Sequence, residues 1–124
     1  MMTTAELLAK QCRHQDTALS DAQVQDYLAA LPDWQLQEGR VTRRFAFRNY
    51  YETMAFVNAL AWMIHAEDHH PTLSVAYNHC TVKYHTHSVN GGQGGLSKND
   101  FICAAKADAV FAGAYGVHPG GAQS

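Results

Sequence analysis

Pro71 separates two segments of different periodicity in the middle of the chain, and this change restricts the fold more than any other feature. Before it, Asn49 and Glu52 have the spacing of a helix capping box, and the residues that follow avoid glycine and proline. These features predict a helix over residues 50–66. A helix cannot continue through proline, and beyond it apolar and polar residues alternate as they do in a strand. The helix must therefore end just before Pro71 and be followed directly by a strand.

Two segments of alternating apolar and polar residues lie on either side of this predicted helix. Residues 34–47 alternate around a turn at Glu38–Gly39, and residues 72–86 alternate around a two-residue turn at Asn78–His79. Each segment predicts a β-hairpin. Arg43 falls in phase with the apolar residues of the first hairpin, which indicates either an edge strand or a long side chain that passes beside the core.

Helices are also predicted near both ends of the chain. Apolar residues recur at helical spacing over 21–31, and Ser97 with Asp100 has the spacing of a capping box for a helix that extends to about Gly113. The resulting order is helix-strand-strand-helix-strand-strand-helix, without the strand-helix-strand rhythm of a parallel sheet. We therefore predict an α+β fold, a two-layer sandwich in which a four-stranded antiparallel sheet carries the helices on one face.

The 124 residues suffice for a single domain, which we place at residues 19–115. Residues 1–18 show no sustained period and are predicted to be a loosely ordered leader without chemistry, and residues 116–124 are predicted to be a flexible tail. The glycine-rich segment 88–95 lacks the ending of a phosphate-binding loop, so we interpret it as a mobile connector.

Charge, cysteine content and hydropathy exclude several classes of function. The formal net charge is −2 and no run of Lys or Arg occurs, so the chain lacks the electrostatic footprint of a protein that binds nucleic acid or an anionic membrane. The three cysteines are widely spaced and indicate neither a disulfide framework nor a thiolate zinc site. No apolar run approaches the ~20 residues of a membrane span. We expect a cytoplasmic protein.

Six of the eight histidines lie within residues 65–87. His69 and His70 come at the end of the predicted helix. His85 and His87 share one face at the end of the last predicted strand. A helix end and a strand end can bring these side chains to one cleft. Because imidazoles titrate near neutrality, they can deliver a proton to one atom of a substrate and remove a proton from another.

Two other interpretations of these histidines stay open at this point. A single histidine is more often a surface residue than part of a site. A zinc site is the second alternative, because His65 and His69 lie on one helix face and the pair at positions 85 and 87 can chelate. Zinc proteases with this helical pair carry their general base directly after the first histidine, however, and Ala66 stands there.

A wider set of residues carries a specific resemblance. In order along the chain, the set comprises Asp68-His69-His70-Pro71, Tyr77-Asn78, Thr86-His87, Gly95-Leu96-Ser97 and Asp100. This pattern resembles the signature of the pterin-4a-carbinolamine dehydratases, also called 4a-hydroxytetrahydrobiopterin dehydratases. The resemblance extends over about residues 19–112. The connector before Asp100 is longer in this chain, with Asn90–Gln93 as the extra residues.

The resemblance implies a lyase that removes water from 4a-hydroxytetrahydrobiopterin-type pterins and releases the quinonoid dihydropterin. This reaction recycles the pterin cofactor of aromatic amino acid hydroxylases, so phenylalanine hydroxylase is an implied partner. One proton is delivered to the departing hydroxyl and another is removed from a ring nitrogen. The reaction needs no metal and no cofactor of its own.

The same resemblance implies roles for the site residues. His69 and His87 are the acid/base residues, and His70 mainly holds the pterin. Asp100 is the supporting carboxylate, since a neighbouring acid can orient an imidazole or raise its pKa. The implied substrate-binding residues are Asp68, His69, His70, His85, Thr86, His87 and Ser88.

An interaction module on the same fold is the alternative function. Some members of this family bind transcription factors as coactivators, and related proteins without the histidines act as assembly factors. Such a module has no physical need for three histidines around one cleft, so we favour the enzyme. A His-ligated metalloenzyme is the weakest of the three hypotheses.

The predicted helix 50–66 is apolar over most of its circumference, which favours burial on two sides. Its inward stripe is predicted to consist of Met54, Val57, Ala61 and Ile64. Phe56 and Met63 then lie on a second face that another subunit would cover. We predict a homo-oligomer, a dimer or a tetramer, and the family resemblance implies a dimer of dimers.

Overall fold

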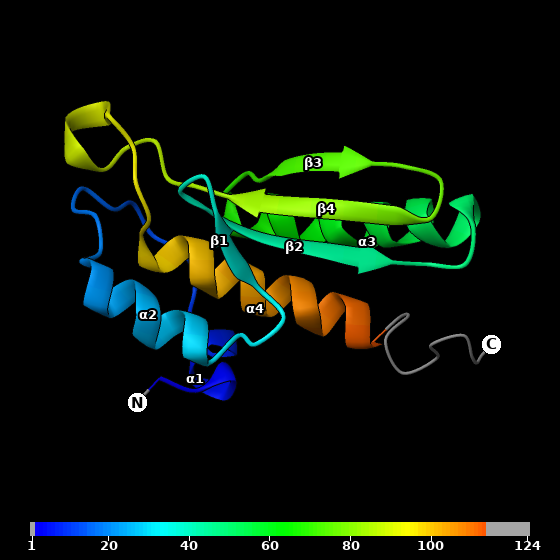
Figure 1. Cartoon of the computed structure of the whole chain (residues 1–124), viewed down its shortest axis with the longest axis horizontal. Helices are drawn as coiled ribbons and strands as arrows, with labels where there is room; N and C mark the ends of the chain where they lie inside the picture. Colours follow the sequence, from blue (N-terminus) through cyan, green and yellow to red (C-terminus); the bar gives the residue numbers. More distant parts are fainter. Residues whose placement is uncertain (1, 114–124) are drawn as a thin grey trace.

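The computed structural model describes residues 2–113 and follows the predicted order of helices and strands (Figure 1). An additional helix, α1 (Thr4–Leu8), precedes α2 (Asp21–Ala29). The remaining elements are β1 (Gln35–Gln37), β2 (Arg40–Ala46), α3 (Tyr50–Glu67), β3 (Thr72–Val75), β4 (His79–Tyr84), the 3-10 turn η1 (Asn90–Gly92) and α4 (Lys98–Phe111). The predicted tail at 116–124 lies outside the described residues.

The strands form one antiparallel sheet in the order β1-β2-β4-β3. Along β4, Cys80, Val82 and Tyr84 are buried while the residues between them are half-buried, so one face of the sheet carries the core. Helices α3 and α4 pack against the sheet (Figure 1). The prediction of an α+β fold with an antiparallel sheet of four strands and helices on one face is confirmed.

The second hairpin turns one residue earlier than predicted. The N–H of Ala76 donates to the carbonyl of His79 at 2.9 Å, so the turn is at Tyr77–Asn78. Cys80 therefore pairs with Val75 and not with Tyr77. Moving a two-residue turn by one position shifts the pairing by two residues, so Cys80, Val82 and Tyr84 stay on the core face of β4 as the alternation predicts.

Arg43 lies in the central strand β2, so the edge-strand interpretation is wrong and the interpretation as a long side chain beside the core holds. Its Nη1 is 2.6 Å from Asp108 Oδ1 in α4, and its guanidinium lies 4.3 Å from the centroid of the Phe45 ring. Trp34 Nε1 donates to the same carboxylate oxygen at 2.9 Å. Burial raises the pKa of Asp108, and the two donors oppose that effect.

Helix α3 presents a different face to the core than predicted. Phe56 and Leu60 are both 0% exposed, and Met63 packs against the same core. Ala61 is exposed, and Trp62 is 79% exposed. The predicted inward stripe is therefore wrong at Ala61 and omits the two most buried apolar side chains of the helix, Phe56 and Leu60. Phe56 does not face another subunit. Because the helix is apolar nearly all round, its sequence pattern does not distinguish its faces, and packing against the sheet does.

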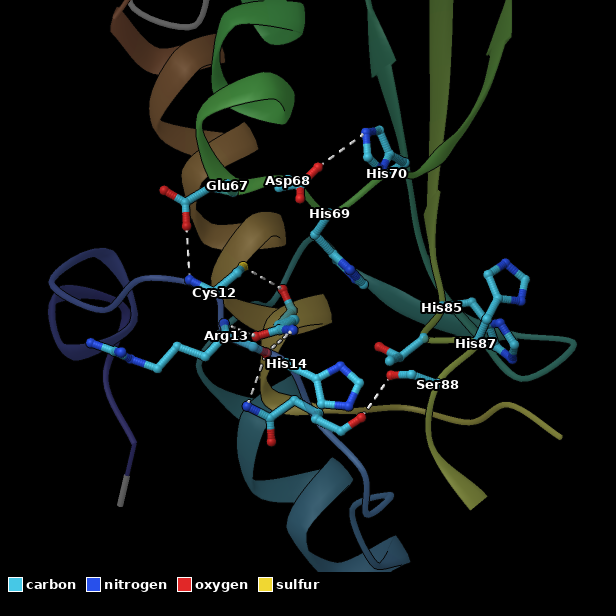
Figure 2. A pocket seen from close by; sticks show the side chains of 13 residues that line it. Cys12, Arg13, His14, Glu67, Asp68, His69, His70, His85, His87 and Ser88 are labelled. Carbon is cyan, nitrogen blue, oxygen red and sulfur yellow. Dashed lines mark hydrogen bonds and ion pairs between the residues drawn. The ribbon is translucent and has the colours of Figure 1, made fainter. Parts of the chain in front are cut away.

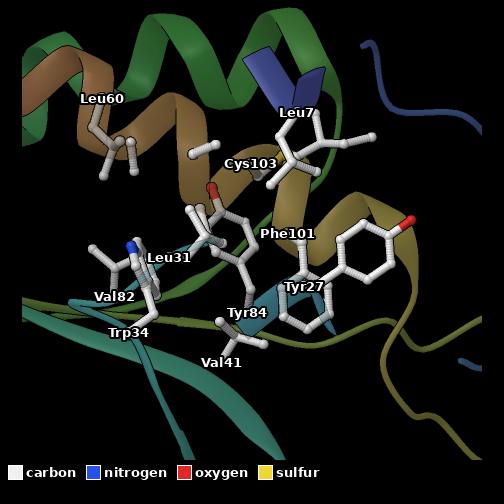
Figure 3. Packing of buried hydrophobic residues seen from close by; sticks show 14 of the residues in the cluster. Leu7, Tyr27, Leu31, Trp34, Val41, Leu60, Val82, Tyr84, Phe101 and Cys103 are labelled. Carbon is white, nitrogen blue, oxygen red and sulfur yellow. The ribbon is translucent and has the colours of Figure 1, made fainter. Parts of the chain in front are cut away.

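The first residues of the chain differ from the predicted loosely ordered leader. Thr3 and Glu6 form a reciprocal capping box at the start of α1, and Leu7 is 0% exposed. Figure 3 shows Leu7 in one buried cluster with Tyr27 and Phe101. The sequence carries the same capping signal here as at the later helices. A buried leucine thus ties the leader to the domain.

Candidate active site

The end of α3 directs two consecutive histidines to different environments. Asp68 follows the helix with a left-handed backbone, φ 52°, and its N–H donates to the carbonyl of Ile64 at 2.9 Å. Pro71 then prevents the helix from continuing. The side chain of His69 is only 13% exposed, whereas that of His70 is 70% exposed.

A buried carboxylate of α4 holds His69. Asp100 has no exposed surface, and its Oδ1 lies 2.7 Å from His69 Nε2. Its Oδ2 accepts hydrogen bonds from Thr86 Oγ1 at 2.8 Å and from the backbone N–H of Ser97 at 2.9 Å. Asp100 is thus part of the capping box of α4 and also the partner of His69. These contacts offset the cost of burying a carboxylate.

The ring of His69 is fixed from a second direction by Tyr84. The two rings are stacked, with centroids 5.5 Å apart and an interplanar angle of 9°. When Nε2 donates its proton to Asp100, Nδ1 of the neutral imidazole is an acceptor. In this tautomer Nδ1 can take a proton, and the carboxylate would stabilise the imidazolium that forms.

The segment after β4 brings two more histidines to the same place. Thr86 and Gly95 exchange two backbone hydrogen bonds of 2.9 and 3.0 Å, which close the predicted mobile connector into a loop. His85 and His87 flank the buried Thr86, and their ring centroids are 5.1 Å apart. His87 is exposed, whereas His85 is half-buried.

His85 is packed against a glycine of this loop. Burial is the main cause that lowers the pKa of His85, which favours the neutral ring. Its Nδ1 is buried and has no hydrogen-bond partner within residues 2–113. A Cβ on Gly94 would lie 2.6 Å from His85 Cε1, and Gly94 has φ 92°, so only glycine fits this position.

The end of α3 and the segment after β4 both line one cleft of about 340 Å³ (Figure 2). The predicted site residues that line it are Asp68, His69, His70, His85, Thr86, His87 and Ser88. The remaining one, Asp100, is buried and meets the cleft through His69. The structure therefore brings all the predicted site residues together.

Residues 17–110 match the family model described as pterin 4 alpha carbinolamine dehydratase. The chain belongs to this family. A relative from Bdellovibrio bacteriovorus, provisionally named a pterin-4-alpha-carbinolamine dehydratase, is 54% identical over 110 residues, which cover 89% of this chain and 92% of that protein. A second protein with the same provisional name, from Nitrosospira multiformis, is 46% identical over 112 residues, which cover 88% of this chain and 96% of that protein.

A solved structure has the same fold as this pterin dehydratase family member. The crystal structure of a transcriptional coactivator/pterin dehydratase from Brucella melitensis matches the chain with a TM-score of 0.68 and 31% sequence identity. The match covers 76% of this chain and 98% of that chain. The family resemblance in the sequence is confirmed.

The cleft has a wall that the sequence patterns did not predict. Its further lining residues are Cys12, Arg13, His14, Gln15, Glu67 and Asn99. The first four belong to the segment that was predicted to be a leader without chemistry. The capping box of α1 was a local signal for order in this segment, but no local signal indicated that the chain beyond α1 reaches the cleft.

Residues 2–113 were compared with two kinds of protein considered above, a metalloenzyme and a membrane-spanning protein. No three side chains of His, Cys, Asp or Glu in this range are grouped so that they could hold a metal ion. His65, half of the helical zinc pair considered above, is exposed and does not line the cleft. No helix in the same range has the length and apolar character that crossing a membrane requires.

Proposed function

We propose that the protein is a 4a-hydroxytetrahydrobiopterin dehydratase, a hydro-lyase of the cytoplasm that recycles the pterin cofactor of an aromatic amino acid hydroxylase such as phenylalanine hydroxylase. The observation that carries the proposal is the buried pair of His69 and Asp100, which shares one cleft with His87 in a chain of the pterin dehydratase family. The provisional names of relatives at 54% and 46% identity support it.

The proposed reaction uses both groups of histidines. Dehydration breaks the bond between C4a and its hydroxyl oxygen, and a ring nitrogen loses a proton so that its electron pair forms the new C=N bond. His69 takes this proton at Nδ1, since Nε2 is held by Asp100. His87 delivers a proton to the departing hydroxyl, which leaves as water. Each such proton transfer typically contributes about 10²–10⁴ in rate.

His70 is proposed to hold the pterin at the mouth of the cleft. Its side chain is 70% exposed and lies 3.8 Å from Asp68 Oδ1, so it is not fixed as His69 is. His70→Ala is expected to raise KM about three- to tenfold and to leave kcat within about twofold, because it removes a contact made equally in ground and transition states. Stopped-flow dehydration kinetics measure both constants. A large fall in kcat at wild-type KM would instead give His70 a part in proton transfer.

An interaction module is the second candidate function, because the Brucella melitensis structure is described as a transcriptional coactivator/pterin dehydratase. A dehydration assay separates the two candidates. The enzyme proposal expects wild-type protein to accelerate the loss of water from 4a-hydroxytetrahydrobiopterin over buffer alone. Folded protein that gives no acceleration would overturn it.

A homo-oligomer, a dimer or a tetramer, is also part of the proposal. Tyr51 and Trp62 of α3 are 86% and 79% exposed. They lie about three helical turns apart and therefore share one face of the helix. Burying an apolar side chain of this size contributes roughly 1.5–3 kcal/mol, so a second copy that covers this face would gain several such contributions.

Trp62→Glu is expected to shift the mass measured by light scattering at micromolar concentration toward smaller species. The charge would have to be buried without a partner in the interface. Leu36→Glu is the matched control, since Leu36 is an exposed apolar residue of β1 and lies outside this helix. Wild-type protein that is monomeric under these conditions would contradict the proposed assembly.

A further inference from the structure

Residues 12–16, which we call the strap, pass along the cleft of the proposed active site. The family match begins at residue 17, so the strap lies outside the part of the chain that defines the family. Four of its residues, Cys12, Arg13, His14 and Gln15, line the cleft. Figure 2 shows the side chain of His14 pointing from the strap toward the cleft. His85 and His87 lie on the opposite side of the cleft.

One end of the strap is tied to the two segments that hold the buried histidine-carboxylate pair. The N–H of Cys12 donates to Glu67 Oε1 at 2.9 Å, and Glu67 ends the helix that leads to His69. Arg13 exchanges two hydrogen bonds with the side-chain amide of Asn99. Its N–H donates to Oδ1 at 3.1 Å, and its carbonyl accepts from Nδ2 at 2.6 Å. Asn99 directly precedes the carboxylate that binds His69.

The other end of the strap is tied to the loop that follows His87. Ser88 Oγ donates to the carbonyl of Gln15 at 2.6 Å, and the N–H of Asn90 donates to the carbonyl of Asp16 at 3.2 Å. Each of these hydrogen bonds engages a backbone group of the strap. The position of the strap therefore does not depend on which side chain residue 14 carries.

His14 repeats the arrangement of His69. Its Nε2 lies 2.6 Å from Asp16 Oδ1, as Nε2 of His69 lies 2.7 Å from Asp100 Oδ1. In both neutral rings Nδ1 is then the acceptor. The pairs differ in burial, since the side chains of His14 and Asp16 are 72% and 82% exposed. An exposed acceptor at the edge of a cleft can meet a ligand without displacing any protein group.

We propose that His14 is a further substrate-binding residue, whose Nδ1 accepts a hydrogen bond from an N–H or O–H group of the pterin. Asp16 is a positioning residue that orients the ring. The proposal rests on the proposed function, because the pterin is the ligand that brings such donors into the cleft.

His14→Ala is expected to raise KM for 4a-hydroxytetrahydrobiopterin about three- to tenfold with kcat within about twofold, the loss typical of one neutral hydrogen bond. His14→Gln, which keeps an acceptor, is expected to recover part of the loss, and Asp16→Asn to give an intermediate KM. His65→Ala is the matched control, since His65 is an exposed histidine outside the cleft, and its KM is expected to equal that of wild type.

Fluorescence titration with oxidised biopterin, an unreactive pterin, gives a second readout. Its Kd is expected to rise in His14→Ala by a factor similar to that of KM, while Tm stays at the wild-type value. Unchanged KM and Kd in an active protein would overturn the role of His14 and leave the dehydratase proposal intact. A lower Tm with both kcat and KM altered would show a structural role and overturn it as well. Wild-type protein that neither dehydrates substrate nor binds biopterin would overturn both proposals.

Discussion

His69→Ala is expected to lower kcat for the dehydration of 4a-hydroxytetrahydrobiopterin by about 10²–10⁴-fold, the contribution of one general acid–base group. The physical reason is the fixed geometry of this imidazole. It is 13% exposed, its Nε2 lies 2.7 Å from Asp100 Oδ1, and its ring is stacked on Tyr84. Alanine has no group that can take a proton at that position. Stopped-flow kinetics at saturating substrate measure kcat directly.

A second variant distinguishes a loss of catalysis from a loss of folding. His69→Gln retains an amide that can donate to Asp100, so the buried carboxylate keeps its partner, but the amide cannot take a proton at neutral pH. It is expected to match His69→Ala in kcat and wild type in Tm. His65→Ala, outside the cleft, is expected to keep wild-type kcat. If both His69 variants turn over at the wild-type rate, His69 takes no part in the reaction.

Phe56→Ala is expected to lower the free energy of unfolding by about 3–5 kcal/mol. The Phe56 side chain is 0% exposed, and its ring centroid lies 4.7 Å from that of Phe45 and 5.2 Å from that of Phe47. Removing the ring leaves a cavity that these neighbours fill only in part. Urea denaturation followed by circular dichroism measures the change.

Met54→Ala is the matched control on the same helix. Met54 belongs to the stripe that the sequence pattern placed inward, and in the structure it is only half-buried and outside the main core cluster. Its replacement is expected to cost no more than about 1 kcal/mol. A loss for Met54→Ala equal to that for Phe56→Ala would contradict the orientation of α3 in the structure.

Local patterns were sufficient to predict the order of the helices and strands from α2 to α4 and to place the histidines near the ends of two of these elements. Pro71 and the helix-capping residue Asn49 act on residues within one or two helical turns, so the bounds of α3 could be predicted closely. The alternation over residues 72–86 placed His85 and His87 at the end of a strand, and in the structure β4 ends at Tyr84, directly before them. Each of these signals depends only on residues that are near one another in the chain.

Tertiary packing decided three features of the molecule. These are the inner face of α3, the wall of the cleft formed by residues 12–15, and the hydrogen bond between His69 and Asp100. The apolar residues of α3 are spread around its circumference, so only its contacts with β4 and α4 select the face that carries Phe56. The family resemblance named His69 and Asp100, yet their hydrogen bond joins residues 31 positions apart and forms because α3 packs against α4. The strap is bound at separations of 55 and 86 positions, by backbone groups of Cys12 and Arg13. The backbone N–H and C=O groups are the same in every residue except proline. The amino-acid sequence therefore has no local pattern that predicts which hydrogen bonds these groups form.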